Sequence, residues 1–221
     1  MLLAVDTSTR AMGIAIFDGH NLLSQESWQT SQHHTVELAQ AVKNNISRIG
    51  VSVDDLTALG VALGPGSFTG LRIGMAFMKG IAFHQQLPLV GIPTLDITAE
   101  SQPVREDELA AVLKAGRSRY AVGWYRAEDG RWISQGRVDN FSLEELLEKI
   151  KGPIQIAGEL SPEAHRELSD NPHVSLASPV ESYRSPAVLA QLAWSKWKKG
   201  DDGNPAAISP IYLNRDQPLT L

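Results

Sequence analysis

Two polar segments in the first third of the chain carry residues whose types and spacing could do chemistry. The first, Asp6-Thr7-Ser8-Thr9, follows the short apolar run Leu2–Val5. A carboxylate that ends a strand, with hydroxyl groups on the next turn, can orient a metal-bound phosphate. The same residue types also form ordinary turns, because their side chains bond to the nearby backbone. The ordinary turn is the more frequent outcome, so this segment alone does not decide a function.

The second segment runs from Gly64 to Gly74, after a predicted strand and at the start of a predicted helix. Glycine lets backbone N–H groups approach a bound group, and a helix N-terminus favours anions. The segment lacks the Gly-Lys-Ser/Thr ending of a P-loop and does not match the dinucleotide fingerprint. A structural turn with close helix packing is the alternative. The candidate contacts for a nucleotide or a partner, from both segments, are Asp6, Thr7, Gly64, Pro65, Gly66, Ser67, Thr69, Gly70 and Arg72.

The remaining reactive residue types form no catalytic or metal-binding pattern. The chain has no cysteine, which excludes thiolate nucleophiles, thiolate-bound zinc and iron–sulfur clusters. Its six histidines include no His-x-x-x-His pair, and the adjacent His33 and His34 would point about 100° apart on a helix. No Gly-x-Ser-x-Gly elbow occurs. We therefore predict no catalytic residue and no metal ligand in this chain.

Composition limits the partners that the chain could bind directly. The net charge is −5, whereas a protein that binds nucleic acid directly normally presents a basic face. The one compact basic cluster, Lys196 with Lys198 and Lys199, fits a solvated helix end equally well. No apolar run approaches the roughly 20 residues of a membrane span, and Asp6 comes too early for a secretory signal. A cytoplasmic location without membrane contact is expected.

The elements that would position these segments alternate in the manner of an α/β protein. Strands are predicted at 2–5, 12–17, 22–28, 59–63 and 89–92, with helices at 35–49 and 69–82. This order suits a ribonuclease H-like lobe with a mixed sheet flanked by helices. A polar stretch at 100–108 predicts a boundary. Ser142-Leu143-Glu144-Glu145 is a capping box that predicts the start of a helix, and Ser185-Pro186 begins another. The predicted lobes are 1–100 with 185–221, and a smaller one at 101–184.

Residues 64–74 are similar to the GPGSFTGLRIG signature of the TsaB (YeaZ) family over eleven consecutive positions. Residues 2–9, 31–34 and 210–213 resemble that family's opening strand and turn, its entry to the first helix and its C-terminal Pro-x-Tyr-Leu. The resemblance covers the first 95 residues well, the tail fairly and the middle in outline. It implies the actin-like, ribonuclease H-like fold of two lobes.

The resemblance also implies a function without catalysis by this chain. Members of the TsaB family pair with TsaD, which transfers threonylcarbamoyl to an adenosine of tRNA, and the ATPase TsaE completes the assembly. It implies that tRNA is reached only through the complex and that no cofactor is bound tightly, and it leaves a nucleotide at the partner interface open. In the middle of the chain, Ala115-Gly116-Arg117 stands where members usually carry Asp-Ala-Arg, which puts that aspartate's contact in doubt.

Two other functions remain open at this stage. One is an enzyme of the actin-like superfamily, such as a small-molecule kinase or a peptidase. A kinase needs a second phosphate-binding turn with acidic residues, and Leu113–Arg119 supplies no carboxylate for magnesium. The other is a structural homodimer without a role in tRNA modification.

The helix that begins near Thr69 is the predicted partner surface, serving a homodimer when TsaD is absent. The resemblance implies that this helix and the one before it build both contacts. A stripe that faces the protein core is the alternative, because apolar residues at helical spacing most often pack inward. The predicted interface residues are Ile73, Gly74, Phe77, Met78 and Ile81, with Val36 and Ala39 from the preceding helix.

Overall fold

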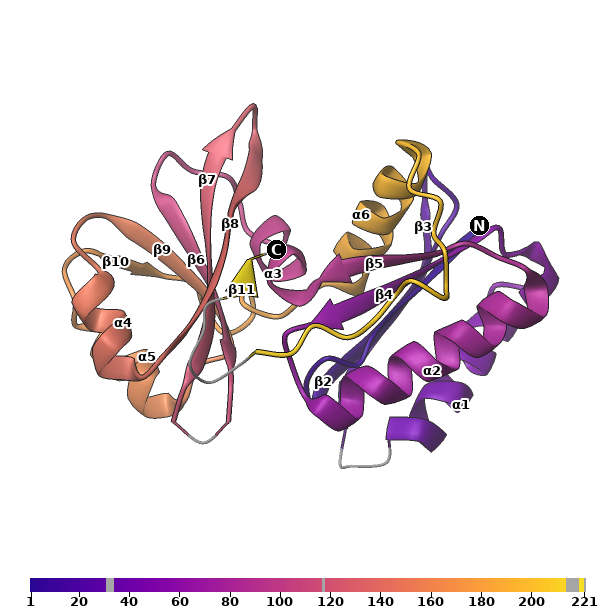
Figure 1. The fold of residues 1–221 in the computed structure, drawn as a ribbon, viewed down its shortest axis with the longest axis horizontal. Coiled ribbons are helices and arrows are strands. Elements are labelled where there is room, and N and C mark those ends of the chain that lie inside the picture. Colours follow the sequence, from indigo (N-terminus) through magenta and orange to yellow (C-terminus); the bar gives the residue numbers. More distant parts are fainter. Residues whose placement is uncertain (31–33, 117, 214–218, 221) are drawn as a thin grey trace. The chain divides into compact units, whose positions relative to one another are not determined.

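The computed structural model describes residues 1–30, 34–116, 118–213 and 219–220 (Figure 1). The chain forms two compact units, the first made of Met1–Thr94 and Ser185–Ile211, the second of Leu95–Arg184 and Tyr212–Leu221. The first boundary therefore falls at Thr94 rather than at residue 100, and the tail beyond Ile211 groups with the second unit rather than the first. The physical reason is packing, because α3 (Thr94–Glu100) buries Leu95 and Ala99 in the core of the second unit.

The first unit is built on a five-stranded mixed sheet in the order β3-β2-β1-β4-β5. The hairpin strands β1 (Leu2–Asp6), β2 (Ala11–Phe17) and β3 (Leu22–Gln29) are antiparallel. On the other side of β1, β4 (Ala58–Gly64) and β5 (Leu89–Pro93) run parallel to it. Every residue of the central strand β1 is buried, because helices cover both faces of the sheet.

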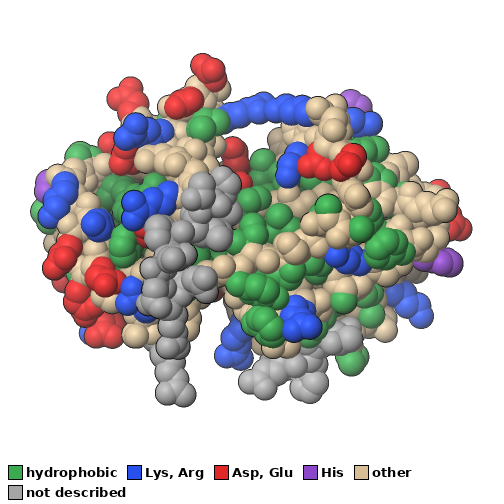
Figure 2. Space-filling model, viewed as in Figure 1, with side chains coloured by type: hydrophobic (Ala, Val, Ile, Leu, Met, Phe, Trp, Pro, Cys, Tyr) green, Lys and Arg blue, Asp and Glu red, His purple; other side chains and the backbone are tan. Residues whose placement is uncertain are grey.

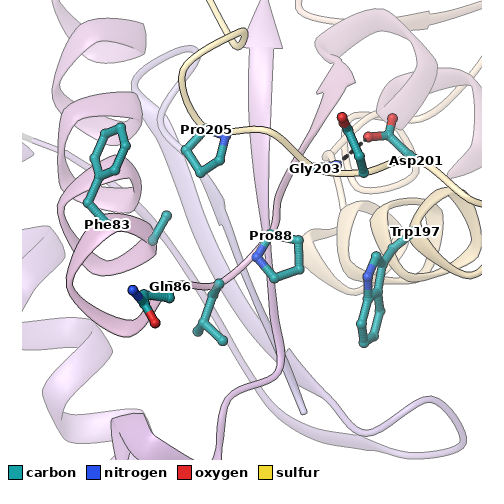
Figure 3. A pocket seen from close by; sticks show the side chains of 10 residues that line it. Phe83, Gln86, Pro88, Trp197, Asp201, Gly203 and Pro205 are labelled. Carbon is teal, nitrogen blue, oxygen red and sulfur yellow. Dashed lines mark hydrogen bonds between the residues drawn. The ribbon is translucent and has the colours of Figure 1, made fainter.

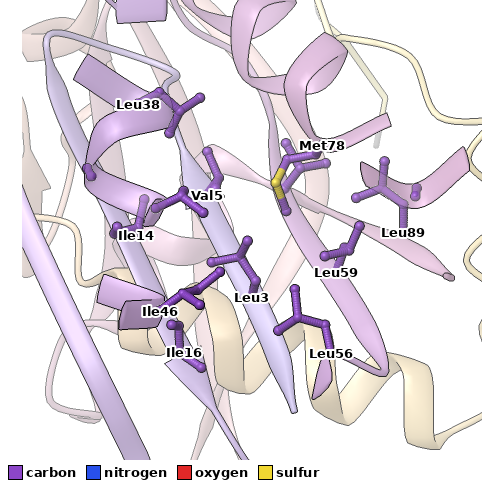
Figure 4. Packing of buried hydrophobic residues seen from close by; sticks show 14 of the residues in the cluster. Leu3, Val5, Ile14, Ile16, Leu38, Ile46, Leu56, Leu59, Met78 and Leu89 are labelled. Atoms are coloured by element: carbon purple, nitrogen blue, oxygen red, sulfur yellow. The ribbon is translucent and has the colours of Figure 1, made fainter. Parts of the chain in front are cut away.

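Helices α1 (His34–Arg48) and α2 (Phe68–Gln85) lie on one face of this sheet. Their inward residues join Leu3, Val5 and Ile14 in one apolar cluster (Figure 4). Helix α6 (Pro186–Lys198) covers the other face. It approaches closely because Gly13 and Gly60 lack side chains; an added Cβ at Gly60 would lie 2.8 Å from the Ala193 Cβ.

The second unit contains a six-stranded sheet in the order β10-β9-β6-β7-β8-β11. Helices α4 (Leu143–Lys149) and α5 (Pro162–Ser169) cover one face, and α3 packs on the other. The predicted capping box at Ser142 opens α4, with Ser142 and Glu145 bonded to each other's backbone N–H. The strands are β6 (Glu108–Lys114), β7 (Tyr120–Glu128), β8 (Arg131–Phe141), β9 (Ile154–Gly158), β10 (Val174–Leu176) and β11 (Leu219–Thr220).

Candidate functional site

The two polar segments singled out in the sequence lie directly against each other in the first unit. The turn between β1 and β2 rests on the loop between β4 and α2. The Thr7 hydroxyl donates a hydrogen bond to the carbonyl oxygen of Gly70, at 2.8 Å. The Ser67 N–H donates to the carbonyl oxygen of Ser8, at 2.6 Å. We call this interlocked pair, residues 6–9 with residues 64–74, the clasp.

Three glycines of the clasp are required by this close approach. A Cβ added at Gly66 would lie 2.2 Å from the Ser8 carbonyl oxygen, and one at Gly70 would lie 2.2 Å from that of Thr7. At Gly74 an added Cβ would lie 2.1 Å from Oγ1 of Thr7. Such distances are far inside van der Waals contact. The glycines thus let one segment of the chain pack against another, which is the structural alternative of the sequence analysis.

The polar groups of the clasp are largely engaged within it. Asp6 is buried, and its Oδ1 accepts hydrogen bonds from the backbone N–H of Ser8 at 2.8 Å and from the Ser8 hydroxyl at 2.5 Å. Ser67 is the N-cap of α2 and accepts from the Gly70 N–H at 3.2 Å. A site for a metal-bound phosphate would need a carboxylate that faces the metal and N–H donors that face the phosphate. Here Asp6 accepts hydrogen bonds from Ser8, and the Gly70 N–H donates to the Ser67 hydroxyl. These groups are therefore used within the clasp.

The start of the glycine loop is fastened to a distant part of the chain. Ile211 N–H donates to the carbonyl oxygen of Leu63 at 2.7 Å, and a Cβ at Gly64 would lie 2.5 Å from the Ile211 carbonyl oxygen. The Gly64 N–H donates to the Thr94 hydroxyl at 3.1 Å. Pro65 is buried beside them. Gly64 and Pro65 therefore hold the end of β4 in place and do not reach solvent.

Solvent does reach the first turn of α2. Phe68 is 57% exposed, and the Arg72 guanidinium lies 5.0 Å from the centre of its ring. Ser67 and Thr69 are exposed beside them. Of the predicted contact residues, Gly66, Ser67, Thr69 and Arg72 are therefore the ones exposed to a partner or a ligand.

The predicted interface on α2 needs correction at two residues. Met78 is fully buried in the core of the first unit, and Gly74 is buried beneath Thr7. Neither can contribute surface to a contact. Helix α2 is apolar on most of its sides, so periodicity could not separate the core-facing positions, which are Leu71, Met75, Met78 and Ala82.

The rest of the predicted interface is accessible, and two residues were missed. Ile73, Phe77 and Ile81 are half-buried, while Val36 is 74% exposed and Ala39 is exposed on α1. The structure adds Ala76 and Gly80, both exposed, to the outer side of α2. Small residues four positions apart on a helix were the available signal. We call the accessible set the helix face: Val36, Ala39, Ile73, Ala76, Phe77, Gly80 and Ile81. Figure 2 shows hydrophobic side chains gathered over α2.

In the second unit, the turn after β6 provides no acidic group. Lys114 and Gly116 are exposed, and Arg119 donates to Oε2 of Glu145 at 2.9 Å. Arg117, part of the departure noted in the sequence, lies outside the described residues. Within the part of the chain that the structure describes, no three His, Asp or Glu side chains come together as metal ligands.

The titratable groups near α3 lie where this helix packs against the second sheet. The Tyr125 hydroxyl donates to Oδ1 of Asp96 at 2.7 Å, and burial, followed by the negative charge of Asp96, raises the pKa of Tyr125 well above its usual value. Partial burial also raises the pKa of Glu100. Both effects follow from α3 covering one face of the second sheet.

None of the described helices is long and apolar enough to cross a bilayer.

Comparison with known proteins identifies the family. A family model described as "TsaD: tRNA N6-adenosine threonylcarbamoyltransferase" matches residues 27–167. The tRNA threonylcarbamoyladenosine biosynthesis protein TsaB of Escherichia coli is 32% identical over 162 residues, which cover 72% of this chain and 68% of that protein. The chain belongs to the TsaB family. TsaB of Bacillus subtilis is 27% identical over 150 residues, covering 68% of this chain and 66% of that protein.

Solved structures confirm the predicted fold class. YeaZ from Pseudomonas aeruginosa superposes with a TM-score of 0.79 at 24% identity, covering 96% of this chain and 99% of that one. The ethanolamine utilization protein EutJ from Carboxydothermus hydrogenoformans gives 0.53 at 11% identity over 86% of this chain and 88% of that one. This TsaB-family chain thus has the actin-like fold, with two mixed sheets flanked by helices.

Proposed function

We propose that this chain is a non-catalytic subunit in the biosynthesis of threonylcarbamoyladenosine in tRNA, and that it acts by binding a TsaD protein. Its TsaB relatives are named for that biosynthesis, and the matching family model is named for the transferase. The observation that carries the non-catalytic part is the clasp. An enzyme of the actin-like superfamily needs polar groups that face a ligand at its first turn, whereas Asp6 is turned onto Ser8 and Ser67 onto Gly70.

The helix face is the proposed contact with TsaD. Ala39, Ala76 and Gly80 are small and exposed, so a partner backbone can approach them closely. Val36 and Phe77 would supply apolar area to bury. The same face would make a homodimer when TsaD is absent, and TsaE would join the assembly of the two proteins. The net charge of −5 supports an indirect route to tRNA through the complex, with no tightly bound cofactor in this chain.

Co-purification tests this contact. The tagged chain is expressed together with the TsaD of the same organism, as wild type, as Ala39→Glu and as Ala76→Glu. A glutamate in a dry contact leaves an unpaired charge that costs about 3–5 kcal/mol, so each variant should retain less than about a tenth of the wild-type TsaD. Gln191→Glu, which adds the same charge at an exposed position of α6, is the matched control.

Circular dichroism must show that the variants keep the wild-type fold. Wild-type recovery of TsaD by both glutamate variants would refute the helix face as the contact. If the wild-type protein does not retain TsaD at all and remains a dimer, the result supports the alternative function, a structural homodimer without a role in tRNA modification.

A second assay separates the subunit from the enzyme alternative. Highly purified chain is incubated with ATP and magnesium, and phosphate release is expected to equal the buffer control. Hydrolysis above that control, abolished by Asp6→Asn, would support an actin-like-superfamily enzyme and refute the non-catalytic role.

A further inference from the structure

A groove of about 550 Å³ opens in the first unit where α2 and α6 end. A volume of this size accommodates one or two large side chains of a ligand or partner. Helix α2 has 18 residues and is therefore about 27 Å long, so the groove lies far from the clasp at its other end. The lining residues are Ala82, Phe83, Gln86, Leu87, Pro88, Trp197, Asp201, Asp202, Gly203 and Pro205.

The lining combines flat apolar surfaces with acidic groups. Phe83 is 62% exposed, so its ring is accessible to a ligand or a partner. Pro88 lies between Phe83 and Trp197, so the side chains of α2 and α6 border one hollow (Figure 3). The only charged side chains among the ten lining residues are Asp201 and Asp202. Two helix C-termini, each with partial negative charge, end beside the same hollow.

The acidic rim is held in a fixed position. Asp201 Oδ1 accepts from the Gly203 N–H at 2.8 Å, and its Oδ2 lies 3.2 Å from Lys196 Nζ. The Leu89 N–H donates to the Gly203 carbonyl oxygen at 2.7 Å, which ties the rim to β5. Gly203 is needed there because an added Cβ would lie 2.6 Å from Pro88. The rim is therefore organised before any ligand arrives.

Asp202 is the acidic residue of the groove whose carboxylate is accessible to a ligand. It is exposed, and its Oδ1 accepts from the Asn204 N–H at 3.2 Å. It takes part in no ion pair among the described residues, whereas Asp201 is paired with Lys196. Trp197 already accepts a cation, since Lys198 Nζ lies 4.1 Å from its ring centre. Lys198 does not line the groove, whereas part of Trp197 does; the Trp197 ring also makes a T-shaped contact with Trp194, with ring centroids 5.2 Å apart.

We propose that this groove binds an arginine side chain presented by a partner polypeptide. A planar guanidinium stacks on aromatic and proline surfaces and pairs with a carboxylate through two parallel hydrogen bonds. Trp197, Phe83 and Pro88 supply the surfaces, and Asp202 supplies the carboxylate. A lysine fits less well, because its compact ammonium is strongly hydrated and cannot pair with a carboxylate through two parallel hydrogen bonds. This inference concerns a second contact and does not rest on the TsaD contact of the helix face.

The test uses a capped nine-residue peptide with one central arginine between prolines, and a matched peptide with neutral citrulline in its place. The tryptophan indole N–H signals of the full chain are followed by NMR, with the Trp197 signal assigned through Trp197→Phe. The arginine peptide should shift that signal in a saturable manner, and the citrulline peptide should bind several-fold more weakly. Asp202→Asn should weaken the arginine peptide about fivefold. Asp107→Asn, an equal charge change at an exposed site in the second unit, should leave its affinity unchanged.

Four results would overturn the proposal. The first is no shift of the Trp197 signal at millimolar peptide, and the second is equal binding of the citrulline peptide. The third is equal binding of free arginine, which would make the occupant a small molecule. The fourth is a Trp197 signal that moves on dilution of the protein alone, which would make the occupant a second copy of this chain.

Discussion

The clasp makes a sharp prediction about Gly74 and Thr7. In Gly74→Ala the new Cβ lies 2.1 Å from Oγ1 of Thr7, so the Thr7 side chain must move and give up its hydrogen bond to the Gly70 carbonyl oxygen. Overpacking of this kind costs about 1–3 kcal/mol, and the lost buried hydrogen bond costs about 1 kcal/mol more. Alanine recovers about 1 kcal/mol of helix propensity. We expect a net loss of about 1–3 kcal/mol in the free energy of unfolding.

Replacing Thr7 by alanine should remove the stability cost of Gly74→Ala. In a Thr7→Ala background Oγ1 and Cγ2 are gone, and the nearest remaining atom, the Thr7 Cβ, would lie 3.2 Å from the new methyl group. Gly74→Ala should then be neutral or stabilising by up to about 1 kcal/mol. The coupling energy between the two substitutions, which is the difference between these two effects, should therefore be about 1–4 kcal/mol.

Urea unfolding of the four proteins of this cycle, followed by circular dichroism and tryptophan fluorescence, measures the coupling. Gly80→Ala is the control on the same helix, because nothing lies within 4 Å of its added Cβ. It should stabilise the chain by about 0.5–1 kcal/mol. A Gly74→Ala cost that is unchanged by Thr7→Ala, or a Gly80→Ala variant as damaging as Gly74→Ala, would refute the steric reasoning.

Three further predictions concern buried groups. Met78→Glu places a carboxylate in the core and should cost about 3–5 kcal/mol of unfolding free energy in urea; wild-type stability would contradict the placement of Met78. Tyr125→Phe leaves Asp96 without this donor and should cost about 1–3 kcal/mol in the same assay, and a neutral result would mean that the bond is not formed. The raised pKa of Glu100 means that its protonated form is favoured in the folded state, so its contribution is present at low pH and is lost as pH rises through that pKa. Glu100→Gln should therefore raise the melting temperature at pH 7 but not below pH ~4, where Glu100 is itself protonated, and equal effects at both pH values would contradict this.

Elements that are defined by local sequence patterns could be predicted from the sequence. The apolar runs that became β1, β4 and β5 and the capping box at Ser142 were each predicted and are present. The family signature at 64–74 led to the correct fold class. These features depend on periodicity, capping chemistry and motif, which are all readable from neighbouring residues.

Features that depend on contacts between residues far apart in the chain could not be predicted from the sequence. The sequence predicts that residues 1–100 belong to the first lobe and predicts no helix at 94–100, but Leu95 and Ala99 of α3 pack on a sheet whose strands come later in the chain. Met78 was placed on the surface, because a helix that is apolar on most sides does not reveal which side meets the sheet. The glycines of the clasp could be read either as a ligand site or as packing, and only the position of Thr7 and Ser8 distinguishes the two.

The position of α6 in the chain has a consequence for how the protein is made. The first unit begins at the N-terminus, yet α6, which covers one face of its sheet, follows all of 95–184. On the ribosome, that face of β1, β2 and β4 therefore stays uncovered while the whole second unit is synthesised. The second unit has most of its residues in one continuous stretch and can begin to fold first. The first unit, although translated before the second, is thus completed only once Pro186–Lys198 has emerged. A chain cut before Ser185 leaves the α6 face of β1, β2 and β4 open to chaperones or proteases.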